Sequence, residues 1–345
     1  MTGTSTLTLL AATPLECTAA APFSAAVLDL DAEGETRRIV ETIRTQMQED
    51  LRRRGVVIGL SGGVDSSVVA ALCVQALGKE RVLGLFMPER HSADDSLRLG
   101  QLVATTLGIE SIVEDIAPAL EGAGCYRRQH EAIRSIVPEY GPGWKFKLVL
   151  PSVLDAGRIG ISRLTVESPT GEVRTERLTS AAYAQLVAAT NYKQRVRKMT
   201  EHYHADRLQY AVAGTPNRLE YDQGFFVKQG DGAADLKPIA HLYKTQVYAL
   251  ARHLCVPEEI CRRPPTTDTF PMAQTQEEFY FGVPYPVMDL CLYARNHGVA
   301  PAAVARATGL SSEQVERVFK DIDAKRRATR YLHLPPLLVD PILEV

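Results

Sequence analysis

The sequence has few of the features that assign a chain to a membrane, a secreted scaffold or a nucleic-acid complex. No apolar run approaches the roughly 20 residues that cross a bilayer. The formal net charge is only −2, so no overall positive field attracts DNA or an anionic membrane. The N-terminus is rich in alanine and threonine and lacks the basic flank of a secretory signal. We therefore expect small-molecule partners, with no nucleic acid and no membrane.

Cysteine is also scarce and scattered. Six cysteines occur in 345 residues, none in a C-x-x-C pair, and no histidine stands at zinc-finger spacing from them. This pattern is typical of free thiols in a reducing compartment. It favours a cytoplasmic protein.

The pattern of apolar residues predicts one large domain after a short lead-in. Residues 1–37 are expected to be a mobile N-terminal tail and lead-in, and residues 38–345 a single domain. Short buried runs predict parallel strands at Val56–Leu60, Val82–Met87, Ser111–Ile116 and Tyr210–Gly214. Helical periodicity predicts helices at Ile39–Arg53, Ser66–Leu77 and Asp94–Leu107. Strands that alternate with helices in this way predict a doubly wound parallel α/β sheet.

Two additions to this α/β core are expected. An insert covers about residues 126–190, and its alternation around Pro169-Thr170-Gly171 predicts a β-hairpin over Leu164–Leu178. The C-terminal third is predicted to be helical. Neither segment has the character of an independent domain.

The strongest chemical signal is Ser61-Gly62-Gly63-Val64-Asp65-Ser66, which follows a buried strand and opens a helix. Two glycines permit the tight backbone that turns successive N–H groups toward one point. The positive end of the helix and the two serine hydroxyls add to this, so the loop suits a phosphate or pyrophosphate. Asp65 fits such an anion site only if a cation accompanies the phosphates, and magnesium takes carboxylate and phosphate oxygens.

This loop is neither of the two common nucleotide motifs, because it matches neither G-x-x-x-x-G-K-[ST] nor G-x-G-x-x-G. The alternative interpretation is a plain Gly-Gly turn in which Ser66 only caps the helix. The strand before it, the helix after it and the acid between the serines favour phosphate binding.

SGGxDS in this setting resembles the ATP pyrophosphatases, which cleave ATP between its α and β phosphates. A second run narrows the resemblance: Gly214-Thr215-Pro216-Asn217-Arg218-Leu219-Glu220, then FFVKQGDGAADLKP at residues 225–238, then Leu242-Tyr243-Lys244-Thr245-Gln246. This run is similar to the ammonia-dependent NAD synthetases, and Pro265-Thr266-Thr267-Asp268 continues in register. The resemblance covers about residues 38–336 and implies the adenine nucleotide α-hydrolase-like fold.

The resemblance implies a role for each matching residue. Gly59, Leu60, Ser61, Gly62, Gly63, Val64, Asp65 and Ser66 would hold the ATP phosphates, with further ATP contacts from Thr215, Lys244 and Thr266. Asp65 and Glu220 would hold magnesium. Lys244 would neutralise charge on the departing pyrophosphate, and Asp65, Lys244 and Thr266 would form the catalytic set. The acceptor substrate would contact Arg195, Lys228, Asp235 and Lys325.

Each of these residues also has an ordinary interpretation. A single lysine or arginine, such as Arg195 or Lys325, is usually a solvated surface charge. Asp231-Gly232 is a common turn dipeptide, which favours Asp235 over Asp231 as the substrate contact. For Asp65, Glu220 and Lys244 the motif context favours the functional interpretation.

The sequence departs from the family on the acceptor side. The family's C-terminal His-Lys pair appears here as Ala324-Lys325, and the segment 126–190 is longer than the family's minimal one. The run Asn191–Met199 also carries one extra residue. These departures concern the identity of the acceptor more than the type of reaction.

The reaction that the resemblance implies has two steps. A carboxylate, with nicotinate adenine dinucleotide as the first choice, attacks the α-phosphate of ATP, and ammonia then displaces AMP to give NAD. The first 37 residues are too few to fold as a glutaminase, so free ammonia or a separate ammonia-supplying subunit is the expected source, and the resemblance implies a homodimer.

Three other functions remain open at this point. A divergent relative would amidate another carboxylate in specialised metabolism. A tRNA-modifying ATP pyrophosphatase is disfavoured by the missing C-x-x-C pair and the absence of a net basic charge. A non-catalytic nucleotide-binding module is disfavoured because Asp65, Glu220 and Lys244 occur together.

Overall fold

The computed structural model describes residues 22–154, 162–266 and 269–342. Its centre is a parallel sheet in the order β3-β2-β1-β7. The strands are β1 (Val56–Gly59), β2 (Val82–Phe86), β3 (Glu110–Val113) and β7 (Ala211–Val212). All three pairings are parallel, which confirms the expected doubly wound sheet and its four strands.

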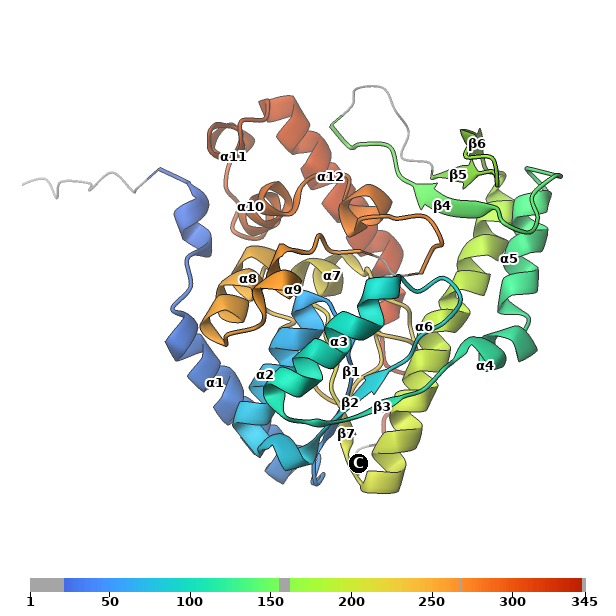
Figure 1. Cartoon of the computed structure of the whole chain (residues 1–345). Coiled ribbons are helices and arrows are strands. Elements are labelled where there is room, and N and C mark those ends of the chain that lie inside the picture. The colour runs from blue at the N-terminus through green and yellow to red at the C-terminus, as the bar shows by residue number, and fades with distance from the viewer. Residues whose placement is uncertain (1–21, 155–161, 267–268, 343–345) are drawn as a thin grey trace, which may run out of the picture.

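Alternate residues of β1 build the two faces of this sheet, since successive side chains of a strand point to opposite sides. Val56 and Ile58 pack with helices α1 (Ala32–Thr45), α2 (Val64–Leu77), α3 (Asp94–Leu107) and α8 (Lys244–His253). Val57 packs on the other face against Ala205 and Leu208 of helix α6 (Ser180–Leu208). The result is three layers, with the sheet between helices (Figure 1).

The first helix begins earlier than the sequence predicts. Helix α1 starts at Ala32 rather than Ile39, because Asp31 caps it: the Asp31 side chain accepts a hydrogen bond from the Gly34 N–H at 3.1 Å. The chain then passes through a π-helical turn, η2 (Gln46–Asp50), before β1. The expected boundary between residues 37 and 38 therefore falls inside a helix.

The segment before α1 is part of the folded body from residue 22 onward. It contains a 3₁₀ turn, η1 (Ala25–Leu28), whose Leu28 is buried among the C-terminal helices. Phe23 packs against the same group of residues. Of the expected mobile tail, residues 1–21 lie outside the described residues.

The insert contains a three-stranded antiparallel sheet in the order β4-β5-β6. The predicted hairpin is confirmed as β5 (Arg163–Glu167) and β6 (Val173–Arg177). Its turn closes through Gly171, which has a φ of +84° and donates its N–H to the Ser168 carbonyl at 2.9 Å. The sequence did not predict the third strand, β4 (Lys145–Val149), which pairs with β5.

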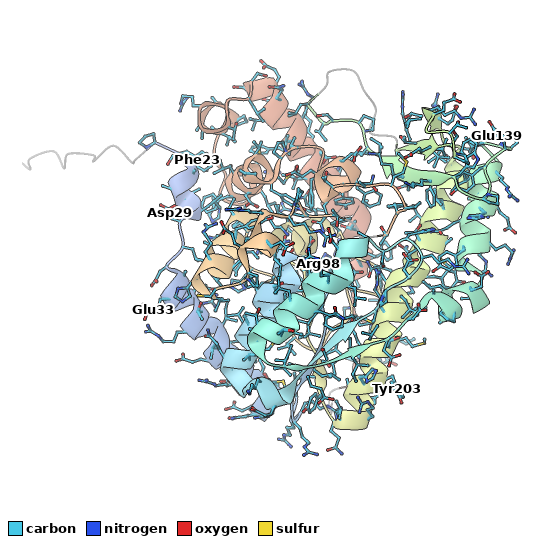
Figure 2. All side chains as sticks on the ribbon, viewed as in Figure 1. Phe23, Asp29, Glu33, Arg98, Glu139 and Tyr203 are labelled. Carbon is cyan, nitrogen blue, oxygen red and sulfur yellow. The ribbon has the colours of Figure 1, made fainter. Side chains whose placement is uncertain are left out.

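Helix α6 joins the insert to the central sheet. Its 29 residues span about 43 Å at 1.5 Å per residue. Thr179 caps its start by accepting from the Ala182 N–H at 3.1 Å. Beside the helix lie α4 (Ala117–Gly122) and α5 (Cys125–Arg134), and Tyr203 marks its far end in Figure 2.

The C-terminal part is helical, as predicted, and has a core of its own. Its elements are α7 (Arg218–Gln223), α9 (Glu258–Arg262), η4 (Glu277–Phe281), α10 (Tyr285–Asn296), α11 (Pro301–Thr308), α12 (Ser312–Thr329) and η5 (Arg330–His333). Buried residues of α10, α11 and α12 pack together and cover α7. Among the described residues, no helix is both long and apolar enough to cross a membrane.

Candidate active site

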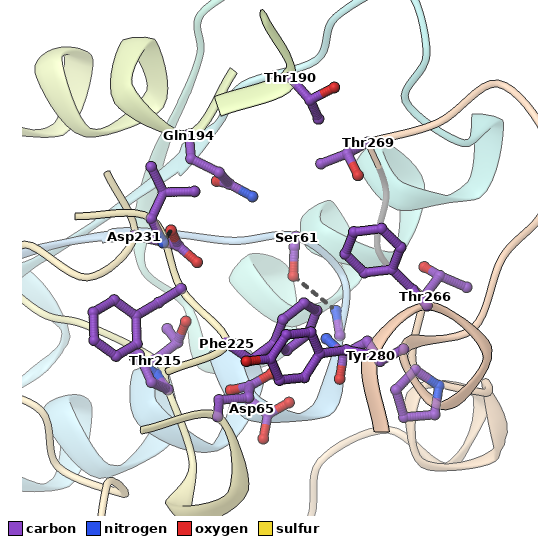
Figure 3. A pocket seen from close by; sticks show the side chains of 18 of the residues that line it. Ser61, Asp65, Thr190, Gln194, Thr215, Phe225, Asp231, Thr266, Thr269 and Tyr280 are labelled. Atoms are coloured by element: carbon purple, nitrogen blue, oxygen red, sulfur yellow. Dashed lines mark hydrogen bonds between the residues drawn. The ribbon is translucent and has the colours of Figure 1, made fainter. Parts of the chain in front are cut away.

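One cavity of about 1040 Å³ lies where the carboxyl ends of β1, β2 and β7 meet α6, α12 and the insert. It brings together side chains that are far apart in the sequence: Ser61 and Asp65, Thr215, Phe225 and Asp231, and Thr266 and Tyr280 (Figure 3). Ligands of open α/β sheets bind at this edge of the sheet. The position therefore suits a nucleotide.

The loop between β1 and α2 forms the floor of the cavity. Gly62 has a φ of +72°, and a Cβ there would lie 2.8 Å from the Ser96 carbonyl oxygen, so only glycine fits. Ser61 Oγ accepts from the Gly63 N–H at 3.3 Å, and Ser66 Oγ donates to the Gly63 carbonyl at 3.0 Å. Of the eight predicted loop residues, all except Gly62 line the cavity: Gly59, Leu60, Ser61, Gly63, Val64, Asp65 and Ser66.

Asp65 lies at the centre of a group of charged and polar side chains and contacts both Lys244 and Asn217. Its Oδ2 is ion-paired with Lys244 Nζ, and its Oδ1 accepts a hydrogen bond from Asn217 Nδ2 at 3.2 Å. Asn217 in turn caps α7 and is fully buried. Its N–H donates at 3.0 Å to Glu220 Oε2, which completes a capping box. One asparagine thus positions both predicted metal ligands.

Lys244 enters the cavity from the first turn of α8. The Asp289 carboxylate on α10 accepts from the backbone N–H groups of Lys244 and Thr245, at 3.2 and 2.7 Å. Burial opposes the charge on Lys244, but the carboxylates of Asp65 and Glu220 raise its pKa. Lys244 is therefore a fixed, buried cation beside the phosphate loop.

The two carboxylates fit a magnesium ion. Burial and the neighbouring Asp65 charge raise the pKa of Glu220 to about 8, so one lysine does not neutralise both acids. Within the described ranges no group of three or more His, Cys, Asp or Glu side chains could hold a metal. Magnesium commonly takes one or two carboxylates and completes its shell with phosphate oxygens and water. Asp65 and Glu220 match that requirement.

Both predicted ATP-binding threonines line the cavity. Thr215 follows Gly214, whose N–H donates to the Leu236 carbonyl at 2.8 Å just beyond β7. Thr266 forms an isolated bridge with Thr275. Thr267 and Asp268, which extended the family resemblance, lie outside the described residues.

Three of the four predicted acceptor contacts line the cavity: Arg195, Lys228 and Lys325. Arg195 Nε donates to the Lys228 carbonyl at 3.3 Å. Lys228 Nζ donates to the Tyr331 and Leu334 carbonyls at 2.8 and 2.9 Å. These hydrogen bonds connect α6, the loop that carries Lys228 and the segment after α12, which together form one wall of the cavity.

Lys325 is more buried than a surface lysine. Its Nζ donates to the Tyr280 carbonyl at 2.7 Å and pairs with Asp321 at 2.6 Å. Burial lowers its pKa against the opposing effect of Asp321. Ala324, which stands in place of the family's histidine, lines the cavity beside it.

Asp235 is not among the residues that line the cavity. Its exposed carboxylate instead accepts from the Val212 N–H at 2.7 Å and so caps the edge of β7. Asp231, which the sequence disfavoured, lines the cavity and accepts from the Val227 N–H at 2.8 Å. Burial raises the pKa of Asp231. Asp231 rather than Asp235 therefore faces the cavity, and a contact of either aspartate with the acceptor stays a prediction.

Sequence reasoning missed the supporting residues. Asn217 carries a recognisable signal, since Asn with Glu three positions later is a helix-start pattern. Asp289 carries none, because α10 lies far from the phosphate-loop motif in sequence, whereas Tyr285 continues the family resemblance in register. The Tyr285 ring lies 5.3 Å from Lys244 Nζ.

Comparison with known proteins identifies the family. A family model described as NAD synthase matches residues 35–135 and 159–330. The chain belongs to this family. The NH(3)-dependent NAD(+) synthetase of Mesorhizobium japonicum is 68% identical over 90% of this chain and 98% of its own length. The NH(3)-dependent NAD(+) synthetase of Rhizobium meliloti is 58% identical over 94% of this chain and 96% of its own length. That of Thermotoga maritima is 38% identical over 82% of this chain and 92% of its own length.

Solved structures with the same fold are more distant in sequence. An NMN synthetase from Francisella tularensis superposes with a TM-score of 0.63 at 23% identity, over 90% of this chain and 99% of that one. An NH3-dependent NAD synthetase from Campylobacter jejuni gives a TM-score of 0.59 at 21% identity, over 90% of this chain and all of the other. At these identities the likeness concerns the fold alone.

Proposed function

We infer that this protein is an ammonia-dependent NAD synthetase, which uses ATP to convert the carboxylate of nicotinate adenine dinucleotide into the amide of NAD. The observation that carries this inference is the 68% identity to the synthetase of M. japonicum over 90% of the chain. The cavity supports it, because the phosphate loop, Asp65, Glu220 and Lys244 meet there. The same identity favours this substrate over a different carboxylate.

The charge of the cavity suits two anionic substrates. Its lining includes nine lysine or arginine and five aspartate or glutamate side chains, an excess of four positive charges. The whole chain is slightly negative, with a net charge of −2. The positive charge is thus concentrated where ATP and the acceptor bind.

In the first step the acceptor carboxylate attacks the α-phosphate of ATP and pyrophosphate leaves. The N–H groups at the start of α2 and the hydroxyls of Ser61 and Ser66 bind the departing phosphates. Lys244 stabilises the negative charge that develops on them, since a buried fixed cation acts strongly there. A magnesium ion held by Asp65 and Glu220 would neutralise further phosphate charge.

In the second step ammonia attacks the acyl-adenylate and AMP leaves. Only unprotonated ammonia is a nucleophile, so the attacking nitrogen must reach the carbonyl without its extra proton. Arg195, Lys228 and Lys325 would hold the acceptor, while Thr215 and Thr266 would contact ATP. The protein contributes positioning and charge neutralisation.

The assembly and setting follow from the same proposal. We expect a homodimer that uses free ammonia or ammonia from a separate subunit, and a cytoplasmic location. The five described cysteines are free, which fits a reducing compartment.

The deciding experiment measures the products of turnover. With ATP, magnesium, ammonium and nicotinate adenine dinucleotide, each NAD formed should be matched by one AMP and one pyrophosphate. Stoichiometric ADP would contradict the adenylation step, and the absence of NAD at every substrate concentration would contradict the acceptor.

A further inference from the structure

The segment that carries Thr266 folds back on itself at the edge of the cavity. The Gln276 N–H donates to the Pro265 carbonyl at 3.1 Å, and Thr266 forms an antiparallel bridge with Thr275. Thr266, which is labelled in Figure 3, and Gln276 both line the cavity. The position of Thr266 therefore depends on residues 272–278, which come after it in the chain and are called the outer arm below.

Strand β4 of the insert lies beside the outer arm. It is an edge strand of its sheet, so the backbone groups on its free side can bind another segment. The Phe146 carbonyl accepts from the Met272 N–H at 3.3 Å. Two residues further along β4, the Leu148 carbonyl accepts from the side-chain amide of Gln274, which is buried. The outer arm is therefore hydrogen-bonded to the insert along its first half.

An ion pair holds the second half. Lys147 Nζ of β4 lies 2.7 Å from Glu278 Oε1 and also donates to the Ala273 carbonyl at 3.4 Å. The side chains of Lys147 and Glu278 are only 18% and 34% exposed, so salt screens this pair less than a fully exposed one. The Leu150 N–H adds a hydrogen bond to the Glu278 carbonyl at 3.2 Å. One lysine of the insert thus reaches both ends of the outer arm.

The residues just before the outer arm are also held in place. The Phe270 ring lies edge-to-face on the Phe146 ring of β4 at 5.6 Å and contacts the Phe279 ring at 5.4 Å. Lys193 of α6 donates to the Thr269 carbonyl at 2.6 Å. The segment after Thr266 is therefore fixed from the insert and from α6 together.

The strand that makes these contacts lies outside the common family pattern. The family model matches residues 35–135 and 159–330, and β4 falls between these two stretches. The outer arm itself falls within the second stretch. A segment particular to this chain and its near relatives therefore supports a segment that belongs to the family pattern.

We propose that Lys147 and Gln274 are positioning residues through which β4 keeps the Thr266 segment in its binding arrangement before ATP arrives. A protein whose binding arrangement is populated only part of the time binds its ligand more weakly by that fraction. With β4 in place, ATP binding does not have to order the segment. This role rests on the proposed function only in naming ATP as the ligand of Thr266.

The test removes the two side-chain contacts and measures the order of the segment directly. Lys147→Met combined with Gln274→Met removes the ion pair and the amide donor while keeping side chains of similar length. Hydrogen–deuterium exchange over residues 269–279 is followed without ligand and with an ATP analogue that has a methylene group between its α and β phosphates. We expect slow exchange in wild type under both conditions. In the double variant, exchange without ligand should be about tenfold faster, and the analogue should restore slow exchange.

The kinetic consequence separates positioning from general damage. The double variant should raise KM for ATP by about tenfold and leave kcat unchanged, because saturating ATP orders the segment. Lys147→Arg alone keeps the charge and should retain the wild-type KM. Lys145→Met, at an exposed residue of the same strand that does not line the cavity, is the matched control and should change neither constant.

Three results would overturn the proposal. The first is fast exchange of the segment in ligand-free wild type, and the second is equal exchange in wild type and the double variant. The third is a double variant with lower kcat and a lower melting temperature but an unchanged KM for ATP, because β4 would then support the fold and not the segment. A wild type that makes no NAD contradicts the proposed function, whereas the exchange measurement still decides whether β4 holds the segment.

Discussion

Asp65, Glu220 and Lys244 form a buried group of two acids and one base, an arrangement that is costly to maintain. Charges taken out of water lose several kcal/mol each, and the pair attraction often only balances that loss. Hydrophobic residues of similar size would fill the space at less cost. The presence of this group is explained by the ligands that we propose for it, the phosphates of ATP and a magnesium ion.

Removing either carboxylate should stop adenylation. For Asp65→Asn and Glu220→Gln we expect AMP release to fall by about 10²–10³ at saturating magnesium, because each loses one charge that faces the transferred group. The exposed Glu316→Gln serves as a matched control and should retain full activity. Near-normal turnover in either site variant would mean that its carboxylate has only a structural role.

Glu220 should also make the free enzyme less stable as the pH rises. Its pKa is raised to about 8 in the folded protein from an ordinary value of 4.5, so the folded state binds more protons than the unfolded state between these values. The contribution of Glu220 to the free energy of unfolding is fully present below pH 4.5 and is lost as the pH rises through 8. Between pH 7 and 9 the loss is about 1 kcal/mol.

The measurement is urea unfolding of the metal-free protein at pH 7 and pH 9. Wild type should lose stability over this interval, and Glu220→Gln, which keeps an acceptor for the Asn217 N–H but has no titrating proton, should lose about 1 kcal/mol less. Equal losses in both proteins would show that Glu220 does not titrate in this range.

At the level of elements, the sequence predicts the central sheet well and the insert only in part. Short apolar runs such as Val56–Leu60, which lie between helical stretches and end at a glycine-rich turn, are typical of inner parallel strands. Strand β4 was missed although Lys145-Phe146-Lys147-Leu148 alternates polar and apolar residues as a half-buried strand does. The run is short, and its pairing with β5 depends on the folded insert. The start of α1 was missed because Asp31 caps a first turn that contributes little to the apolar stripe.

The site was predictable where a motif lies on one loop and unpredictable where separate elements meet. The glycines and serines of residues 61–66 predict a phosphate-binding loop because they follow a buried strand and precede a helix. The packing of α7, α8 and α10 brings the other contacts together. It places Asn217 between Asp65 and Glu220, and it places Asp289 at the start of α8 beside Lys244. These contacts form only in the folded chain, so the spacing of residues along the sequence does not predict them.

A second buried ion pair, Lys193–Glu89, joins three elements near the cavity and should matter for stability. Both side chains are 0% exposed, and Lys193 Nζ reaches Glu89 Oε1 at 2.9 Å, His91 Nδ1 at 2.8 Å and the Thr269 carbonyl at 2.6 Å. Burial and the Lys193 charge lower the pKa of His91 to about 3, so its neutral ring accepts a hydrogen bond. All three ammonium protons thus have acceptors.

We expect Lys193→Met and Glu89→Gln each to cost about 3–5 kcal/mol, because each leaves a partner buried without its counter-charge. The double variant should cost less than the sum of the two. Urea unfolding of the four proteins checks this cycle. Single variants that each cost under 1 kcal/mol would show that the cluster relaxes or admits water.

At the scale of the whole molecule, large apolar side chains are exposed on α6 and β3 as well as in the C-terminal segment. Met199 and Tyr203 stand one turn apart on α6 and are 61% and 63% exposed, and Val113 of the edge strand β3 is 50% exposed. The hydrogen bond between His204 Nε2 and Glu114 Oε1, at 2.8 Å, holds the end of β3 beside α6. Exposed apolar residues that gather on neighbouring elements mark interaction surfaces.

We expect this surface to be the contact with a second copy of the chain, as the proposed homodimer requires. Light scattering coupled to gel filtration should give twice the chain mass for wild type and one chain mass for Met199→Lys combined with Tyr203→Lys, because two lysines in a closed apolar contact meet their symmetric copies and repel. Leu338→Lys, at a residue 60% exposed in the C-terminal segment, is the matched control and should remain dimeric. A dimer that survives the double α6 change but not Leu338→Lys would move the contact to the C-terminal segment. A wild type that stays monomeric at every concentration would remove the dimer altogether.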